Sequence, residues 1–210
     1  MLIGSNIIAP TEIAAVVAPV AIYFLILGLL NSRGRPQLLS GRLDFAILTL
    51  ALSPLLLLPL LSWLGLTPSA LLAVAAALGA AALVLAPRGR NWVVYNVHAA
   101  EARSAVAGAL RKLGLEYRDD GSGFALDGAS VSVGAFAPLR NATVRLLGGD
   151  RELARRFEKA LGEVLRSCEA QTSPMAVSLL LVATAMLVAP LALMAHRVPD
   201  IVRLLTDLIK

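Results

Sequence analysis

The sequence predicts a multi-pass α-helical membrane protein with four transmembrane helices and one inserted small α+β domain. Its 210 residues are 58% hydrophobic and only 16% charged, whereas soluble domains carry about 25% charged residues. Four long apolar runs contain no charged residue, and the polar segment 88–172 separates the third run from the fourth. Each run is long enough to cross the hydrocarbon core of a bilayer as a helix.

The first two expected spans differ in regularity. The span 13–30 is an apolar run without a charged residue, whereas the span 45–66 contains Pro54 and Pro59. Proline removes a backbone donor and clashes with the preceding turn, so the second span is expected to be bent or broken there. This candidate helix break is either a kink that serves packing or the wall of a binding cavity.

Two further apolar segments and a tail complete the expected membrane part. The third span, 69–86, is rich in alanine, which permits close helix packing. With it, residues 1–87 hold three transmembrane helices, and 173–196 holds the fourth. In the tail 197–210, the charged residues would share one side of a helix and the apolar residues the opposite side. That pattern predicts an amphipathic interfacial helix, which binds either lipid or a partner protein.

The placement of arginines predicts the orientation in the membrane. Arg33, Arg35 and Arg42 lie between the first two spans, and Arg88 and Arg90 follow the third. Because cytoplasmic loops are enriched in cations, the inserted domain is expected in the cytoplasm and both termini outside. The excess of arginine over lysine, with abundant alanine and leucine, is typical of a bacterial gene, so the expected location is a bacterial inner membrane.

The segment 88–172 has the pattern of one small α+β domain. An apolar stripe predicts a helix over 99–113 that Gly114 ends, and Asp150 is expected to cap a second helix that runs to Cys168. The alternating or turn-bounded segments predict strands over 91–97, 115–118, 124–126, 130–136 and 142–147. The order β-α-β-β-β-β-α predicts an antiparallel sheet with two helices on one face. This order is loosely similar to ferredoxin-type sandwiches, and it implies no function.

Two groups of side chains are candidates for a functional site. Arg33, Arg35, Arg42 and Asp44 form a candidate cluster at the membrane edge. A candidate basic interaction face consists of Arg140, Arg145, Arg151, Arg155, Arg156 and Lys159. The basic face is either simply solvated or contacts anionic lipid or an acidic protein. Nucleic acid is not expected, because few aromatic residues interleave with the cations.

The sequence contains no pattern that indicates catalysis or a metal centre. His98 and His196 are far apart in the chain, and each suits a loop or an interface. Cys168, the only cysteine, falls on the apolar stripe of its helix, which predicts a buried thiol. We therefore expect no catalytic residue, no cofactor and no metal ligand.

These observations favour a non-enzymatic integral membrane anchor, assembly or regulatory subunit whose cytoplasmic domain mediates protein interaction. The expected partners are the lipid bilayer and either another protein or a second copy of the chain. One alternative is a small transporter or channel-type subunit that uses the proline-broken second span, although the spans lack ionisable residues. A second alternative is a membrane-bound enzyme with its site at the cytoplasmic edge.

Overall fold

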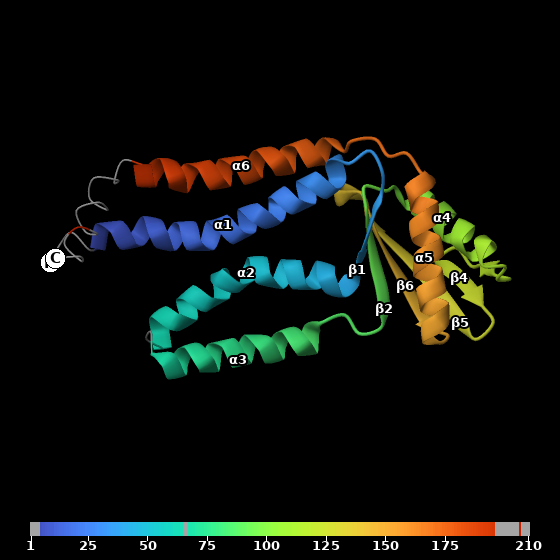
Figure 1. Cartoon of the computed structure of the whole chain (residues 1–210), viewed down its shortest axis with the longest axis horizontal. Helices are drawn as coiled ribbons and strands as arrows, with labels where there is room; N and C mark the ends of the chain where they lie inside the picture. Colours follow the sequence, from blue (N-terminus) through green and yellow to red (C-terminus); the bar gives the residue numbers. More distant parts are fainter. Residues whose placement is uncertain (1–4, 65–66, 196–205, 207–210) are drawn as a thin grey trace. The chain divides into compact units, whose positions relative to one another are not determined.

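A computed structural model describes residues 5–64, 67–195 and 206. The chain divides into two compact units. Unit 1 comprises Met1–Ile26, Leu48–Val84 and Leu179–Lys210, and unit 2 comprises Leu27–Ile47 and Leu85–Ser178. The elements are, in chain order (Figure 1), α1 (Ser5–Ser32), β1 (Gln37–Ser40), α2 (Gly41–Leu64), α3 (Pro68–Leu85), β2 (Arg90–Tyr95), α4 (Ala99–Lys112), β3 (Arg118–Asp119), β4 (Gly123–Leu126), β5 (Ala129–Phe136), the short 3₁₀ helix η1 (Ala137–Leu139), β6 (Asn141–Gly148), α5 (Arg151–Ser167) and α6 (Pro174–Ala195).

Unit 2 is an α+β fold built on a six-stranded antiparallel sheet. The strand order is β1-β2-β6-β5-β4-β3, and α4 and α5 cover one face of the sheet (Figure 1). The rings of Trp92 on β2 and Phe157 on α5 pack with their centroids 5.6 Å apart. Val144 on β6 and Val106 on α4 are fully buried in the same core. The sheet and its two helices therefore enclose one continuous core.

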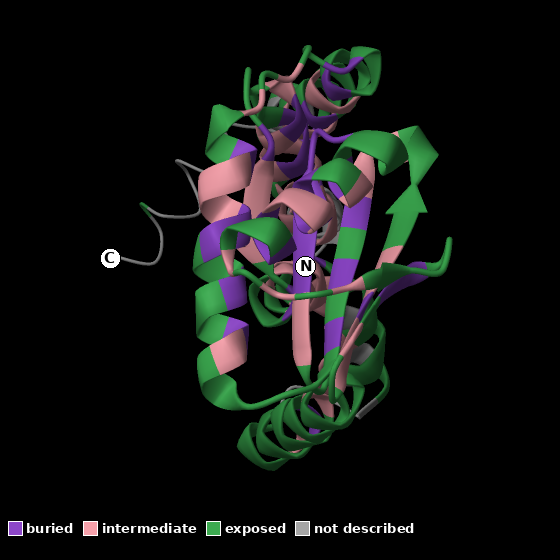
Figure 2. Ribbon diagram, turned by 90° about the vertical axis from the view of Figure 1, so that its right-hand side faces the viewer, coloured by how far each residue is buried: buried purple, intermediate pink, exposed green. Residues whose placement is uncertain are grey.

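Local sequence explains why these elements form where they do. Buried and exposed residues alternate along β6, as the bands of colour on the strands show in Figure 2. The side chain of Asp150 accepts a 2.7 Å hydrogen bond from the backbone N–H of Leu153, so the predicted N-cap of α5 is confirmed. Gly114 follows α4 with a φ of +67°, which a glycine adopts without strain.

The first strand was not foreseen in the sequence. Residues 31–42 lie between the first two expected spans and include no expected strand, but Gln37–Ser40 forms β1 and pairs with β2 from Gln37↔Tyr95 to Ser40↔Trp92. Leu38 packs against the core between the sheet and α5. The apolar side chain of Leu38 and the free edge of β2 together explain why this short segment is extended.

The prediction of four transmembrane helices is wrong for the described part of the chain. There, only α3 is both long and apolar enough to cross a membrane, and the apolar helical segments Val16–Ser32 and Pro174–Pro190 are shorter. Unit 2 also contains one end of each of the four apolar runs. It includes Leu27–Ile47 and extends to Ser178. The structure is therefore an α+β fold with six helices of the α type in the described residues, rather than a multi-pass integral membrane protein.

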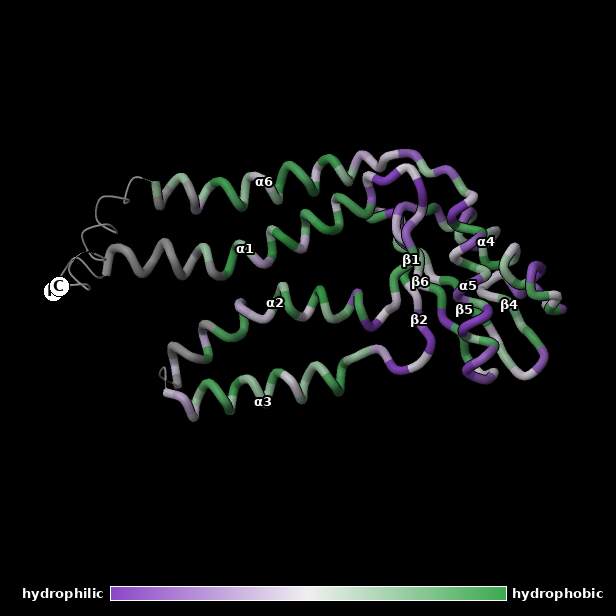
Figure 3. Tube along the Cα trace, in the orientation of Figure 1, coloured by the Kyte–Doolittle hydropathy of each residue, from purple (hydrophilic) through white to green (hydrophobic). Residues whose placement is uncertain are grey.

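Helix α3 differs from the helices of unit 2 in its surface. Its mean hydropathy is 2.2 and only 6% of its residues are buried. Leu72 and Leu83 are 72% and 78% exposed. Figure 3 shows hydrophobic colours along α3, whereas α4 and α5 carry mixed colours. The tail 197–210, expected to be an amphipathic helix, lies outside the described residues apart from Thr206.

Candidate functional site

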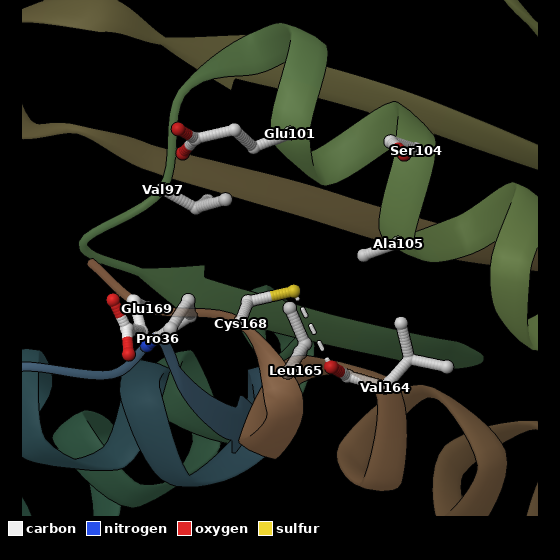
Figure 4. Close-up of a pocket in the computed structure, with 9 residues that line it drawn as sticks. All are labelled: Pro36, Val97, Glu101, Ser104, Ala105, Val164, Leu165, Cys168 and Glu169. Atoms are coloured by element: carbon white, nitrogen blue, oxygen red, sulfur yellow. Dashed lines mark hydrogen bonds between the residues drawn. The ribbon is translucent and has the colours of Figure 1, made fainter.

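A cavity of about 330 Å³ lies between α4 and α5 (Figure 4). Three of its lining residues come from α4 and two from α5, and the remaining ones come from the loops next to β1, β2 and α5. The nine residues are Pro36, Val97, Glu101, Ser104, Ala105, Val164, Leu165, Cys168 and Glu169. We call this cavity the α4–α5 pocket.

The lining of the α4–α5 pocket suits binding better than catalysis. Its polar groups are two carboxylates, one hydroxyl and one thiol, and its other lining side chains are aliphatic. A thiol or hydroxyl becomes a nucleophile when a base lies beside it. None of the nine lining residues is a His, Lys or Arg, and the Cys168 thiol donates a 3.3 Å hydrogen bond to the Val164 carbonyl, shown dashed in Figure 4.

Cys168 is positioned differently from the sequence-based expectation. Helix α5 ends at Ser167, and Cys168 is its C-cap in an extended conformation. The thiol is partly exposed rather than buried. The apolar stripe of α5 stops one residue earlier than its sequence pattern indicates, because the chain turns away from the core at this residue.

A second and larger cavity of about 720 Å³ runs between β1 and α5. We call it the β1–α5 groove. It shares Pro36 and Leu165 with the α4–α5 pocket, so the two cavities are neighbours. The other lining residues are Arg35, Gln37, Leu38, Glu158, Lys159, Gly162, Glu163 and Arg166.

One carboxylate of the β1–α5 groove is already paired. Glu163 forms a salt bridge with Lys112 of α4, and its Oε2 lies 2.6 Å from the Lys112 Nζ. The hydrogen bond from Lys112, its charge and the charges of Lys159 and Arg166 lower the pKa of Glu163 below its usual value. Glu163 therefore stays ionised, and it holds α4 and α5 together beside the groove.

A buried polar junction positions the segment that leads into β1. Asn31 donates from its side chain to the Leu27 carbonyl at 2.9 Å, and its Oδ1 accepts the backbone N–H of Asn96 at 3.2 Å. The Asn96 side chain donates to the Arg33 carbonyl at 2.7 Å. The Ser173 N–H donates to the Asn31 carbonyl at 3.3 Å. The end of α1, the end of β2 and the start of α6 are thus joined at one place.

The candidate membrane-edge cluster does not form one site. The guanidinium of Arg33 donates to the Gln37 side chain at 3.0 Å, and Arg35 lines the β1–α5 groove. Arg42 is exposed in the first turn of α2. The carboxylate of Asp44 accepts a hydrogen bond from the Tyr95 hydroxyl on the sheet. Each residue therefore has a separate environment.

The candidate basic face is divided between elements. Arg151, Arg155, Arg156 and Lys159 are exposed along α5. The remaining two lie elsewhere. Arg145 is on β6, opposite Asn91 of β2, and lies on the face of the sheet away from α5. Arg140 follows η1 and donates a 3.0 Å hydrogen bond to the Gln171 carbonyl. Only Lys159 of the six lines the β1–α5 groove.

The candidate helix break in the second apolar run is not a break in the structure. Helix α2 continues from Gly41 to Leu64 with Pro54 and Pro59 inside it. Proline can be accommodated within a helix where its missing hydrogen bond is tolerated by the local geometry. Helix α2 therefore contains both prolines and ends at neither of them.

Sequence reasoning missed the residues that form the two cavities. Glu101, Ser104 and Glu169 carry no motif, and they become neighbours only because α4 packs on α5. A weak signal for β1 was present, since Leu38 and Leu39 are an apolar pair between Pro36 and Gly41. No family model, no curated protein and no solved structure matches this chain.

Proposed function

We propose that this chain is a non-enzymatic, membrane-associated assembly or regulatory subunit whose α+β unit binds another protein. One observation carries the proposal. Helix α3 is long and apolar enough to cross a bilayer, and 6% of its residues are buried. Apolar surface in water costs about 25 cal/mol per Å², so an apolar environment around α3 stabilises the chain.

The chemistry of unit 2 supports interaction rather than catalysis. The α4–α5 pocket and the β1–α5 groove adjoin each other at Pro36 and Leu165. Their lining residues offer carboxylates, cations and aliphatic side chains, and they include no pair of a nucleophile and a histidine base. Such surfaces recognise polar and apolar groups of a partner.

The charges next to α3 support a cytoplasmic position for unit 2. Arg88 and Arg90 follow α3 directly, whereas Thr67 just before α3 and Pro68 and Ser69 at its start carry no charge. Cations beside a membrane helix favour the cytoplasmic side. The proposal therefore places the C-terminal end of α3, and unit 2 after it, in the cytoplasm.

Cysteine labelling tests the membrane contact of α3. In a Cys168→Ser background, Ala77→Cys lies at the exposed middle of α3, Ser69→Cys at its start and Glu116→Cys on the surface of unit 2. With a membrane-impermeant maleimide, we expect Ser69→Cys and Glu116→Cys to react in opened cells, and Glu116→Cys not to react in intact ones. Ala77→Cys should react only after detergent is added.

The matched control is the maleimide reaction of the same three cysteine variants in detergent, where all three should react. If Ala77→Cys reacts as fully as Ser69→Cys in opened membranes without detergent, α3 is not in the bilayer and the proposal fails. If Glu116→Cys reacts in intact cells, the cytoplasmic position of unit 2 is wrong while the membrane contact stands.

A further inference from the structure

Strand β1 is an edge of the sheet in unit 2. It has a single neighbour, β2, in the strand order. Within the described residues, the backbone of β1 pairs with β2 and with no other strand. An antiparallel strand directs only half of its backbone N–H and C=O groups to one neighbour, so an edge strand offers the other half to an added chain.

The free edge of β1 opens onto the β1–α5 groove. Gln37 and Leu38 of β1 line one side of this cavity, and Lys159, Gly162 and Arg166 of α5 line the other. Its volume of about 720 Å³ is within the range of binding cavities for ligands, roughly 300–1,000 Å³. A sheet edge beside a helix is an arrangement in which extended peptides bind by adding a strand.

Gly162 gives a reason to expect an occupant in this groove. It lies inside α5, where glycine is less favourable than alanine by roughly 1 kcal/mol. A Cβ at this position would meet only the Leu38 side chain, at 3.8 Å, which is ordinary contact. Packing within the chain therefore does not require glycine here. The missing side chain instead leaves room for another group to approach α5 closely.

The charges of the groove indicate what kind of occupant fits. Glu163 is paired with Lys112, and the other charged residues of the lining are the three cations Arg35, Lys159 and Arg166 and the single carboxylate Glu158. These cations form no salt bridge in the described part of the chain. The surplus is positive, so a second copy of this chain would bring the same surplus to the contact, whereas an acidic segment would complement it.

We propose that the β1–α5 groove binds an extended acidic segment of a partner protein, which adds to β1 as a seventh strand. Backbone hydrogen bonds join the segment to the free edge of β1. A small apolar side chain faces Gly162 and Leu165, and carboxylates two residues before and two residues after it, on the same face of the added strand, face Lys159 and Arg166. This inference rests on the proposed role in protein interaction, and it names the site and the class of ligand.

Peptide binding to the full-length chain in mild detergent tests the inference. The probe is an eight-residue fluorescein-labelled peptide, Glu-Thr-Ala-Thr-Glu-Thr-Ala-Thr, in which glutamate and alanine share one face of an extended strand. Its binding is measured by fluorescence anisotropy. One comparison peptide replaces each glutamate by lysine. A second keeps the glutamates but carries N-methyl groups on alternate backbone amides, which removes strand pairing and leaves the charge. We expect half-saturation below ~1 mM for the acidic peptide and about tenfold weaker binding for both others.

Variants of the chain locate the binding. Gly162→Leu fills the groove, and the pair Lys159→Glu with Arg166→Glu reverses its charge. The matched control is Arg151→Glu with Arg155→Glu, which reverses two exposed cations of α5 that do not line the groove. We expect about tenfold weaker binding for the first two and unchanged binding for the control. Circular dichroism shows whether each variant is folded, and the charge-reversal pair decides the outcome if Gly162→Leu is not.

Several outcomes would overturn the inference. Equal binding of the acidic and N-methylated peptides would exclude strand addition, and equal loss in the Arg151 and Arg155 control would indicate general attraction to α5. A dimer in light scattering that Gly162→Leu dissociates would make a second copy the occupant. If no peptide binds detectably at concentrations up to ~1 mM, the inference would also be overturned. None of these results affects the labelling of α3, so the proposed membrane association would stand or fall separately.

Discussion

Asn96 joins segments of the chain that are far apart in sequence. Its backbone N–H and its side chain bond to Asn31 and Arg33, 65 and 63 residues away. The residue is fully buried, and its φ of +57° lies in the left-handed region, which asparagine tolerates better than most residues. One side chain thus fixes the approach to β1 and the turn between β2 and α4.

Replacement of Asn96 separates the two contributions of this residue. Asn96→Ala removes the hydrogen bond to the Arg33 carbonyl and strains the left-handed backbone, so we expect the free energy of unfolding to fall by ~3 kcal/mol. Asn96→Gly removes the same hydrogen bond without the backbone strain and should cost ~2 kcal/mol. Urea denaturation in mild detergent measures both. Equal values for alanine and glycine would show that the backbone conformation carries no cost.

The hairpin of β4 and β5 depends on the close approach of two strands. Gly123 pairs with Ser132 at the start of β4. A Cβ on Gly123 would lie 2.4 Å from the Val131 carbonyl oxygen, which is backbone and cannot move aside easily. Gly134 on β5 is different, because a Cβ there would meet nothing within 4 Å. The two glycines therefore have different roles in the same sheet.

Alanine substitutions at these two glycines form a matched pair. Gly123→Ala forces β4 away from β5 and should lower the free energy of unfolding by ~2–3 kcal/mol. Gly134→Ala should leave it unchanged or raise it by ~0.5 kcal/mol, since glycine in a strand is entropically unfavourable. Thermal denaturation monitored by circular dichroism compares the two variants with the parent chain. A loss of stability in Gly134→Ala as large as in Gly123→Ala would contradict the steric explanation.

At the scale of the elements, α5 shows how much local sequence can predict. The cap Asp150, the stripe that includes Phe157 and Leu161, and the polar opposite face are all set within one stretch. The helix and its buried face could therefore be predicted from periodicity. The end of α5 at Ser167 could not, because the Cys168 position depends on how the chain returns toward Asn31 and Gly34.

At the scale of the whole molecule, unit 2 is assembled from separated parts of the chain. Leu27–Ile47 contributes β1 and Asn31, and the remaining part runs from Leu85 to Ser178. The Ala170 N–H donates to the Gly34 carbonyl at 3.0 Å, which ties the segment after α5 to the loop before β1. A fragment cut at 88–172, the boundaries expected from composition, therefore lacks an edge strand and its anchors.

Fragments of unit 2 test this assembly. One fragment contains 88–172 alone, and the other joins Leu27–Ile47 to Leu85–Ser178 through a flexible glycine and serine linker. The second restores β1 and the hydrogen bonds of Asn31, so its melting temperature should be higher by ~10 °C or more. Thermal circular dichroism measures the difference. The longer fragment with Asn96→Ala should lose most of the increase in melting temperature. Equal melting temperatures of the two parent fragments would show that β1 is dispensable.

The sequence by itself determined the local elements of the α+β unit. Alternation in β6, the caps of α4 and α5 and the glycine turns are set by residues within one or two turns of each other, so they are visible in the chain. Only the tertiary structure decided that Leu27–Ile47 belongs to unit 2, because this assignment depends on contacts with residues far along the chain. It also decided that Gln37–Ser40 is a strand, since that pairing joins residues more than fifty positions apart. Both cavities follow from the same cause: α4, α5 and β1 meet through long-range packing, which no local pattern of residues encodes.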